Sequence, residues 1–348
     1  MAIRLFQPFV SWRAKWNAVK TLSSGYLSEG DRVKQFENEF KKLFNLTNVV
    51  AVNSATSALT LAYDLADIQS GDRVIVPVLT CAATSIELAR RGAKIVFADI
   101  DEDLNISIDD VKRKITPDTK AVVFVHFGGN NRGLEDIQAI CRMRNITLIE
   151  DAAQAVGSAY WGNSDFACVS LQAIKNLTSG DGGFLICKND FDYERAKKLR
   201  WFGYDRDLKK LKGDTDIVEA GYKFHMNDVT ASIGLGNLKS IDKLFKHKDK
   251  LAKIYRSYGL FDHAWLAGGF TDNYDALKYI YESHGIEIGQ HHYDNRKYTV
   301  FKPFYSDCPM MDKQSKRYFF VPYHFEVSLK QAHLIGTIYA KCSTNNQK

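Results

Sequence analysis

Short apolar runs alternate with amphipathic stretches over about residues 48–200. The stretches, such as 56–66, 83–91 and 134–144, repeat apolar residues at helical spacing, whereas the runs are only four to six residues long and almost continuously apolar. Continuous apolar runs are typical of strands buried on both faces, as in a largely parallel sheet. The alternation therefore predicts an α/β domain with its ligands beyond the carboxyl ends of the strands. The runs are 48–52, 73–76, 94–98, 121–126, 146–150, 167–171 and 183–187.

The pattern changes after Gly221. Residues 226–244 and 249–258 have the periodicity of helices, and the remainder mixes short helices with aromatic-rich segments such as 318–325. We expect a large domain over residues 31–240 and a smaller α+β domain over 241–348. Residues 1–30 are expected to pack on the small domain or on a partner subunit.

Composition narrows the class of protein. Hydrophobic residues make up 45% of the chain and charged residues 25%, which is an ordinary globular balance. The net charge of +6 is dispersed, and the densest basic run, 239–253, also contains Asp242 and Asp249, so we expect no nucleic-acid partner. No apolar stretch approaches the ~18 residues of a membrane span, and no signal peptide is visible. The six cysteines lack the spacing of a metal or redox motif, which favours a cytoplasmic protein without a metal.

Two predicted strands end in polar residues suited to ligands. Residues 53–58, Asn-Ser-Ala-Thr-Ser-Ala, follow the first strand and open a helix, where free amides attract an anion; Ser54 or Thr56 could instead be an N-cap. Residues 150–154, Glu-Asp-Ala-Ala-Gln, follow the strand at 146–150. A carboxylate there could hold a ribose, a metal or a protonated ring nitrogen, or could cap a helix.

A lysine and three glycines follow a third strand. Lys175 precedes Gly180, Gly182 and Gly183, which permit close approach of the backbone to a ligand. The order differs from a phosphate-binding P-loop, in which the lysine follows the glycines. A loop lysine is ordinarily only solvated, so its meaning depends on its neighbours.

Together these segments resemble the DegT/DnrJ/EryC1/StrS family of sugar aminotransferases, which are fold-type-I enzymes dependent on pyridoxal 5′-phosphate (PLP). The resemblance covers about residues 5–330 and includes 24–37, 71–77, 92–99 and 221–235. It implies a mostly parallel seven-stranded sheet between helices and a smaller α+β C-terminal domain. It also implies a homodimer whose active sites borrow residues across the interface, with Lys223 and the N-terminal segment as candidates.

The resemblance assigns roles to individual residues. Lys175 would hold PLP as a Schiff base and then move the proton, while Asp151 would keep the ring nitrogen protonated so that the ring can store electrons. Gln154 would lie near the ring hydroxyl. Three departures from the family pattern are Ala55 in place of glycine, Cys81 in place of an aromatic residue that covers the ring, and Lys223 in place of asparagine. The expected phosphate contacts are Thr56, Ser57, Ser170 and Lys223 of the partner subunit.

The implied reaction moves an amino group from L-glutamate, which leaves as 2-oxoglutarate, to a 4-keto-6-deoxy sugar on UDP, dTDP or GDP. PLP would pass through pyridoxamine phosphate between the two half-reactions. The substrate contacts would come from Tyr26, His126, His291, His292, Arg296 and Lys297, although His291, His292 and Arg296 could also form an ordinary polar loop.

Several alternatives differ in sequence features. A 3-keto sugar or a cyclitol as substrate would leave the same motifs. Lys175 argues against the dehydratases of the family, in which histidine replaces the lysine. A non-catalytic binding protein on the same fold would not need Asp151, Gln154 and Lys175 together. A nicotinamide dehydrogenase would need a Gly-x-Gly-x-x-Gly motif, and residues 53–58 contain no glycine.

Overall fold

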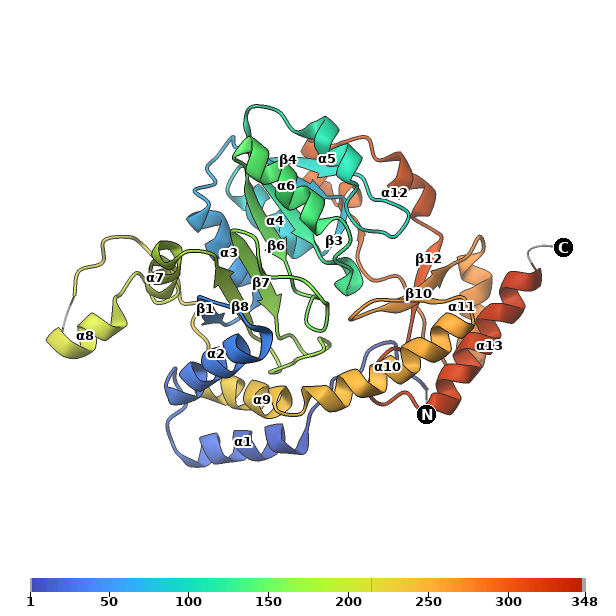
Figure 1. Cartoon of the computed structure of the whole chain (residues 1–348), viewed down its shortest axis with the longest axis horizontal. Helices are drawn as coiled ribbons and strands as arrows, with labels where there is room; N and C mark the ends of the chain where they lie inside the picture. Colours follow the sequence, from blue (N-terminus) through green and yellow to red (C-terminus); the bar gives the residue numbers. More distant parts are fainter. Residues whose placement is uncertain (1, 214, 346–348) are drawn as a thin grey trace.

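The computed structural model describes residues 2–213 and 215–345 and is built around a seven-stranded sheet (Figure 1). The strand order is β1-β8-β7-β6-β5-β2-β4. Only β8 is antiparallel to its two neighbours in this sheet, so the predicted mostly parallel, seven-stranded sheet is confirmed. The strands are β1 (Val49–Val52), β2 (Arg73–Pro77), β4 (Lys94–Ala98), β5 (Thr119–Val125), β6 (Thr147–Asp151), β7 (Phe166–Ser170) and β8 (Gly183–Cys187).

Helices cover both faces of this sheet. Neighbouring side chains on a strand point to opposite faces, so Val74 and Val76 join one hydrophobic cluster and Ile75 joins another. Both faces are therefore apolar, which explains the continuous apolar runs. The cluster of Val74 and Val76 includes residues of α3 (Ala55–Leu65), α4 (Ala82–Arg90) and α7 (Asp190–Leu199). The opposite face packs on α2 (Asp31–Phe44), α5 (Ile108–Lys114), α6 (Leu134–Arg144) and α9 (Asp228–Leu238).

A three-stranded antiparallel sheet and three helices form a second, smaller core. The strands are β9 (Phe261–Asp262), β10 (Ala267–Phe270) and β12 (Tyr318–Val321), in the order β12-β10-β9. The N-terminal segment is attached to this part, since the amide of Ile3 donates to the carbonyl of Gly285 at 2.7 Å. The helices are α10 (Ile241–Ser257), α11 (Tyr274–Ser283) and α13 (Leu329–Asn345).

Residues 293–312 return to the large sheet from within the second half of the chain. β11 (Tyr293–Asp294) pairs with β3 (Leu79–Thr80), which follows β2. The segment continues through η2 (Asn295–Lys297) and η3 (Thr299–Phe304) to α12 (Pro309–Gln314). The amides of Met310 and Met311 donate to the buried carboxylate of Asp99 at 2.8 and 2.9 Å. The division into residues 31–240 and 241–348 therefore stays a prediction.

The N-terminal helix α1 (Trp12–Ser23) lies against α9. Thr21 and Ser232 share a hydrogen bond of 2.6 Å between their hydroxyls, and Gly236 leaves no room for a side chain against the backbone of Ala14. The segment between α7 and α9 carries the short helix α8 (Arg206–Lys212), which projects from the body of the molecule (Figure 1). No described helix has the length and apolar character that a bilayer crossing requires.

Candidate active site

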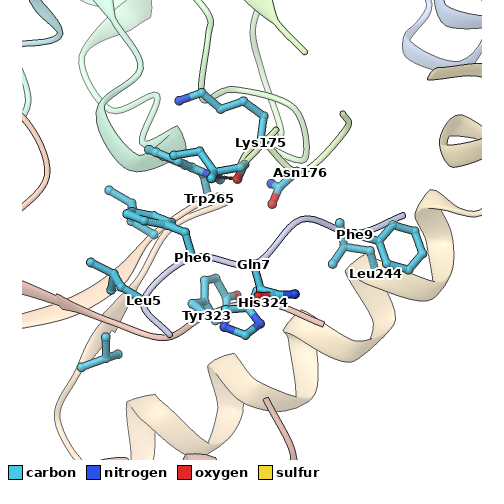
Figure 2. Close-up of a pocket in the computed structure, with 13 residues that line it drawn as sticks. Leu5, Phe6, Gln7, Phe9, Lys175, Asn176, Leu244, Trp265, Tyr323 and His324 are labelled. Atoms are coloured by element: carbon cyan, nitrogen blue, oxygen red, sulfur yellow. Dashed lines mark hydrogen bonds between the residues drawn. The ribbon is translucent and has the colours of Figure 1, made fainter. Parts of the chain in front are cut away.

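Lys175 lies in the loop between β7 and β8, with its amine over an aromatic ring. The Nζ atom is 3.6 Å from the ring centroid of Trp265, and Phe6 stacks on that ring at 5.4 Å (Figure 2). Burial lowers the pKa of Lys175 to about 8, although the charges of Asp151 and Cys81 act to raise it. A lysine with this pKa is partly neutral near physiological pH, as a nucleophilic amine must be.

Asp151 ends β6 and is almost completely buried. One carboxylate oxygen accepts the hydroxyl of Thr84 at 2.6 Å, and the other accepts the amide of Ala153 at 3.1 Å. Thr84 in turn shares a hydrogen bond of 2.9 Å with Thr80, so the carboxylate is oriented by a chain of hydroxyls. The sequence analysis missed Thr84. Two threonines four residues apart, across a helix start that follows a strand, were the available signal.

Gln154 connects the end of β6 to the histidine pair. Its Oε1 accepts the amide of Gly128 at 2.6 Å, and its Nε2 lies 2.9 Å from Nε2 of His292. The rings of His291 and His292 lie 3.9 Å apart, and His291 packs edge-on against Trp265. Burial and then the charge of Lys175 lower the pKa of His291 to about 3, and the pKa of His292 is also well below its usual range because of burial. Both rings are therefore neutral, and His292 accepts from the Gln154 amide.

The start of α3 lies beside the start of β8. Ser54 caps this helix by accepting the amide of Ser57 at 3.0 Å, so the N-cap alternative is observed. Within the described residues, no hydrogen bond is recorded for the amides of Ala55 and Thr56, which leaves two donors for an anion. Gly183 is required here, because a Cβ would come within 2.8 Å of the Ala55 nitrogen.

Two further predicted cofactor contacts border this region. Ser170, at the end of β7, is buried and accepts the amide of Gln172 at 3.2 Å. Cys81 precedes α4, and burial raises the pKa of its thiol, as does the charge of Asp151, while Lys175 acts to lower it. Cys81 therefore lies close enough to Asp151 and Lys175 to feel both charges.

His126 was predicted to contact the substrate, but its buried position does not allow such a contact. Its ring is fully buried and lies 2.8 Å from a carboxylate oxygen of Glu150. Glu150 also accepts the amides of Gly162, Asn163 and Ser164. Because Glu150 and Asp151 are neighbours on a strand, they point to opposite faces of the sheet. His126 therefore lies beneath the sheet, in a structural pair.

The predicted substrate contact of Arg296 is also contradicted. The guanidinium is almost fully buried and forms two hydrogen bonds with Asp294, at 3.0 and 2.8 Å, and one with Asp312 at 2.6 Å. These carboxylates raise its pKa in spite of burial. The guanidinium of Arg296 holds the segment after β11 in place, and its hydrogen bonds to Asp294 and Asp312 compete with any substrate. The neighbouring side chain of Lys297 is exposed.

Tyr26 and Lys223 do not reach Lys175 within the same chain. Tyr26 is 55% exposed and lines a separate cavity together with Arg32 and Arg206. Lys223 is exposed on the segment that pairs with Trp201. Both side chains are exposed, and the carbonyl of Lys223 accepts the side-chain amide of Asn53, which precedes α3, at 3.3 Å.

PLP requires an amine for its aldehyde carbon, a carboxylate beside its ring nitrogen and an anion site for its phosphate. The strand ends provide a candidate for each on a sheet of the fold-type-I arrangement, and the residues present fit the cofactor. The molecule is thus a PLP-dependent transferase of fold type I.

Comparison with known proteins identifies the family. Residues 13–262 match the model of the DegT/DnrJ/EryC1/StrS aminotransferase family, and the chain belongs to that family. The resemblance drawn from the three strand ends is confirmed.

Relatives and solved structures agree with this assignment. The chain is 36% identical to the spore coat polysaccharide biosynthesis protein SpsC of Bacillus subtilis, over 72% of this chain and 67% of that one. It is 32% identical to GDP-perosamine synthase of Vibrio cholerae, over 73% and 70% of the two chains. The crystal structure of AtS13 from Actinomadura melliaura superposes with a TM-score of 0.93 at 29% identity and covers 98% of both chains.

Proposed function

We propose that this enzyme transfers the amino group of L-glutamate to a 4-keto-6-deoxy sugar linked to UDP, dTDP or GDP, giving a 4-amino-4,6-dideoxy sugar nucleotide. The observation that carries the proposal is the amine of Lys175 over the ring of Trp265 together with the buried, oriented carboxylate of Asp151. The relative named GDP-perosamine synthase supports a sugar nucleotide as the amino acceptor.

Each proposed role follows from the chemistry of the side chain. Lys175 would bind the cofactor and, once released, would move the proton as a general base and acid. Asp151 would keep the ring nitrogen protonated, and the cofactor would supply the electron sink. Gln154 and Cys81 would lie beside the cofactor ring.

The phosphate is proposed to lie at the start of α3. The amides of Ala55 and Thr56 and the hydroxyls of Thr56, Ser57 and Ser170 provide hydrogen-bond donors around this helix end. The hydroxyl of Ser57 donates to Asn53 at 2.6 Å, so it must be redirected to contact a phosphate.

A homodimer with shared active sites accounts for the outward-facing residues. Lys223 and Tyr26 are exposed, and we propose that they reach the phosphate and the substrate of the other subunit. We propose His291 and His292 as substrate contacts, because His291 packs on Trp265, the ring under the amine of Lys175, and His292 lies beside His291. Sedimentation of a fully active monomer would refute the shared site.

The test is the visible absorption spectrum of the purified enzyme with PLP, before and after L-glutamate. We expect a band that glutamate bleaches in the native protein and in Lys41→Ala, an exposed control, but no such band in Lys175→Ala. Absence of the band in the native protein would refute the cofactor role of Lys175. Keto sugar nucleotides that differ in the base and in the position of the keto group would then be screened, and amination at C3 would replace the 4-keto assignment.

A further inference from the structure

A buried lysine, Lys248, lies on the core face of α10. It shares that face with Leu244, Leu251 and Tyr255, all of them buried, and is itself only 3% exposed. An apolar residue would be expected there, because an uncompensated buried ammonium is costly. Burial lowers the pKa of Lys248 to about 7, so hydrogen bonds rather than an ion pair hold its amine at this position.

The ammonium of Lys248 uses its whole donor capacity. It donates to Oδ1 of Asn176 at 2.8 Å and to the carbonyls of Ala264 and Trp265 at 2.7 and 3.2 Å. An ammonium has three N–H donors, and each has an acceptor. Its charge also lies 4.2 Å from the ring centroid of Tyr323.

One partner of Lys248 directly follows Lys175 in the chain. Asn176 is buried, and its Nδ2 donates to the carbonyls of Val156 and Ala264, both at 2.8 Å. Its amide group is thus fixed at both ends. The backbone immediately after Lys175 cannot shift without breaking these hydrogen bonds.

The other partner segment carries the ring under Lys175. The indole Nε1 of Trp265 donates to the carbonyl of Ile174 at 2.9 Å, and its backbone amide donates to Gly128 at 2.7 Å. Trp265 is thereby hydrogen-bonded to Ile174, the residue before Lys175. Lys248 is hydrogen-bonded to Asn176, the residue after it. Lys248 binds both segments from a third element, α10 (Figure 2 shows Asn176 and Trp265 on either side of Lys175).

We propose that Lys248 is a positioning residue for the reactive amine: by joining Asn176 to the turn at residues 264–265, it sets where Lys175 rests relative to Trp265 and Asp151. The inference deepens the proposed function and rests on it. Lys248 touches neither Lys175 nor Asp151, so its effect must be geometric.

The test compares Lys248→Met with Lys250→Met, an exposed control on the same helix. Methionine approximates the length of the side chain but leaves Oδ1 of Asn176 and the carbonyl of Trp265 without a donor, while the carbonyl of Ala264 keeps only its hydrogen bond from Asn176. We expect a folded variant with at least about tenfold lower turnover, a KM for glutamate within about threefold of native, and no change in Lys250→Met.

A second measurement is made without cofactor and distinguishes positioning from a general loss of activity. The rate at which trinitrobenzenesulfonate modifies Lys175 in the apo-protein is followed against pH at low extents of reaction, and the modified peptide is assigned by mass spectrometry with Lys175→Ala as the blank. The midpoint of this rate should move by about half a pH unit or more in Lys248→Met and remain native in Lys250→Met. An unchanged midpoint together with native turnover would overturn the inference.

If Lys248→Met does not fold, Asn176→Ala gives the same decision, because it removes one of the three acceptors and the anchor beside Lys175. A native midpoint and native turnover in Asn176→Ala would overturn the positioning role. If the native enzyme with PLP forms no visible band, the proposed function is refuted. The titration of the apo-protein needs no cofactor, so it tests the positioning role separately.

Discussion

The reactivity of Lys175 should be set by an unusually low pKa. The ordinary value is 10.5, and burial lowers the pKa of Lys175 to about 8. Below both values, the fraction of neutral amine is therefore about 300-fold higher than in a lysine with the ordinary pKa. The sign follows from desolvation, which disfavours the charged form of an amine. Reactivity of Lys175 should rise with pH and level off above about pH 8.5.

The assay uses trinitrobenzenesulfonate on the apo-protein between pH 6 and 10, because the charge of this reagent does not change there. Peptide mass spectrometry reports Lys175 and the exposed Lys41 from the same sample. In Asp151→Asn, the charge that raises the pKa of Lys175 is removed, so the midpoint should fall below 8. A midpoint of Lys175 near the ordinary 10.5 in the native protein, or a rise of the midpoint in Asp151→Asn, would refute the reasoning.

Three further substitutions test the surroundings. Thr84→Val removes a hydrogen bond to Asp151 worth about 1.5–3 kcal/mol, so PLP should bind about 10–100-fold more weakly, and an unchanged Kd by titration would contradict this. Arg296→Met leaves the carboxylate of Asp294 buried and unpaired, so denaturant unfolding should show a loss of about 3–5 kcal/mol; loss of turnover at native stability would restore the substrate role. Gly183→Ala places a Cβ 2.6 Å from the carbonyl of Val169 in β7, so both the melting temperature and the affinity for PLP should fall. Native values for both would show that the backbone accommodates the methyl group and that glycine is not required here.

The sheet could be predicted from the sequence because each strand is buried on both faces. Continuous apolar runs marked all seven strands within one or two residues at most ends. The reversed direction of β8 was not predicted. Residues 171–182 connect β7 to β8 without a helix, and a parallel pair is usually joined by a crossover that contains a helix, so the lack of a helix in this loop favours the observed hairpin.

Whether a residue near Lys175 could be predicted from the sequence depends on how far along the chain its contact partners lie. Trp265 and Lys248 were missed because their contacts depend on how the second half of the chain packs, which no local pattern reports. The burial of His126 was accessible from the sequence, since alternation along the strand places it on the same side as Phe124 and Val122. The roles assigned to the individual site residues stay predictions until the substitutions are made.

The return of residues 293–312 to the large sheet has a consequence for synthesis of the chain on the ribosome. Strand β3 and the carboxylate of Asp99 emerge early, but their partners β11, Met310 and Met311 lie about 210 residues further along the chain. The half of the molecule that carries Lys175 therefore waits for residues 293–312 before they can pack on it. A gene fragment that stops after residue 240 would leave the surface that they cover exposed, and its product should associate or be degraded rather than bind the cofactor.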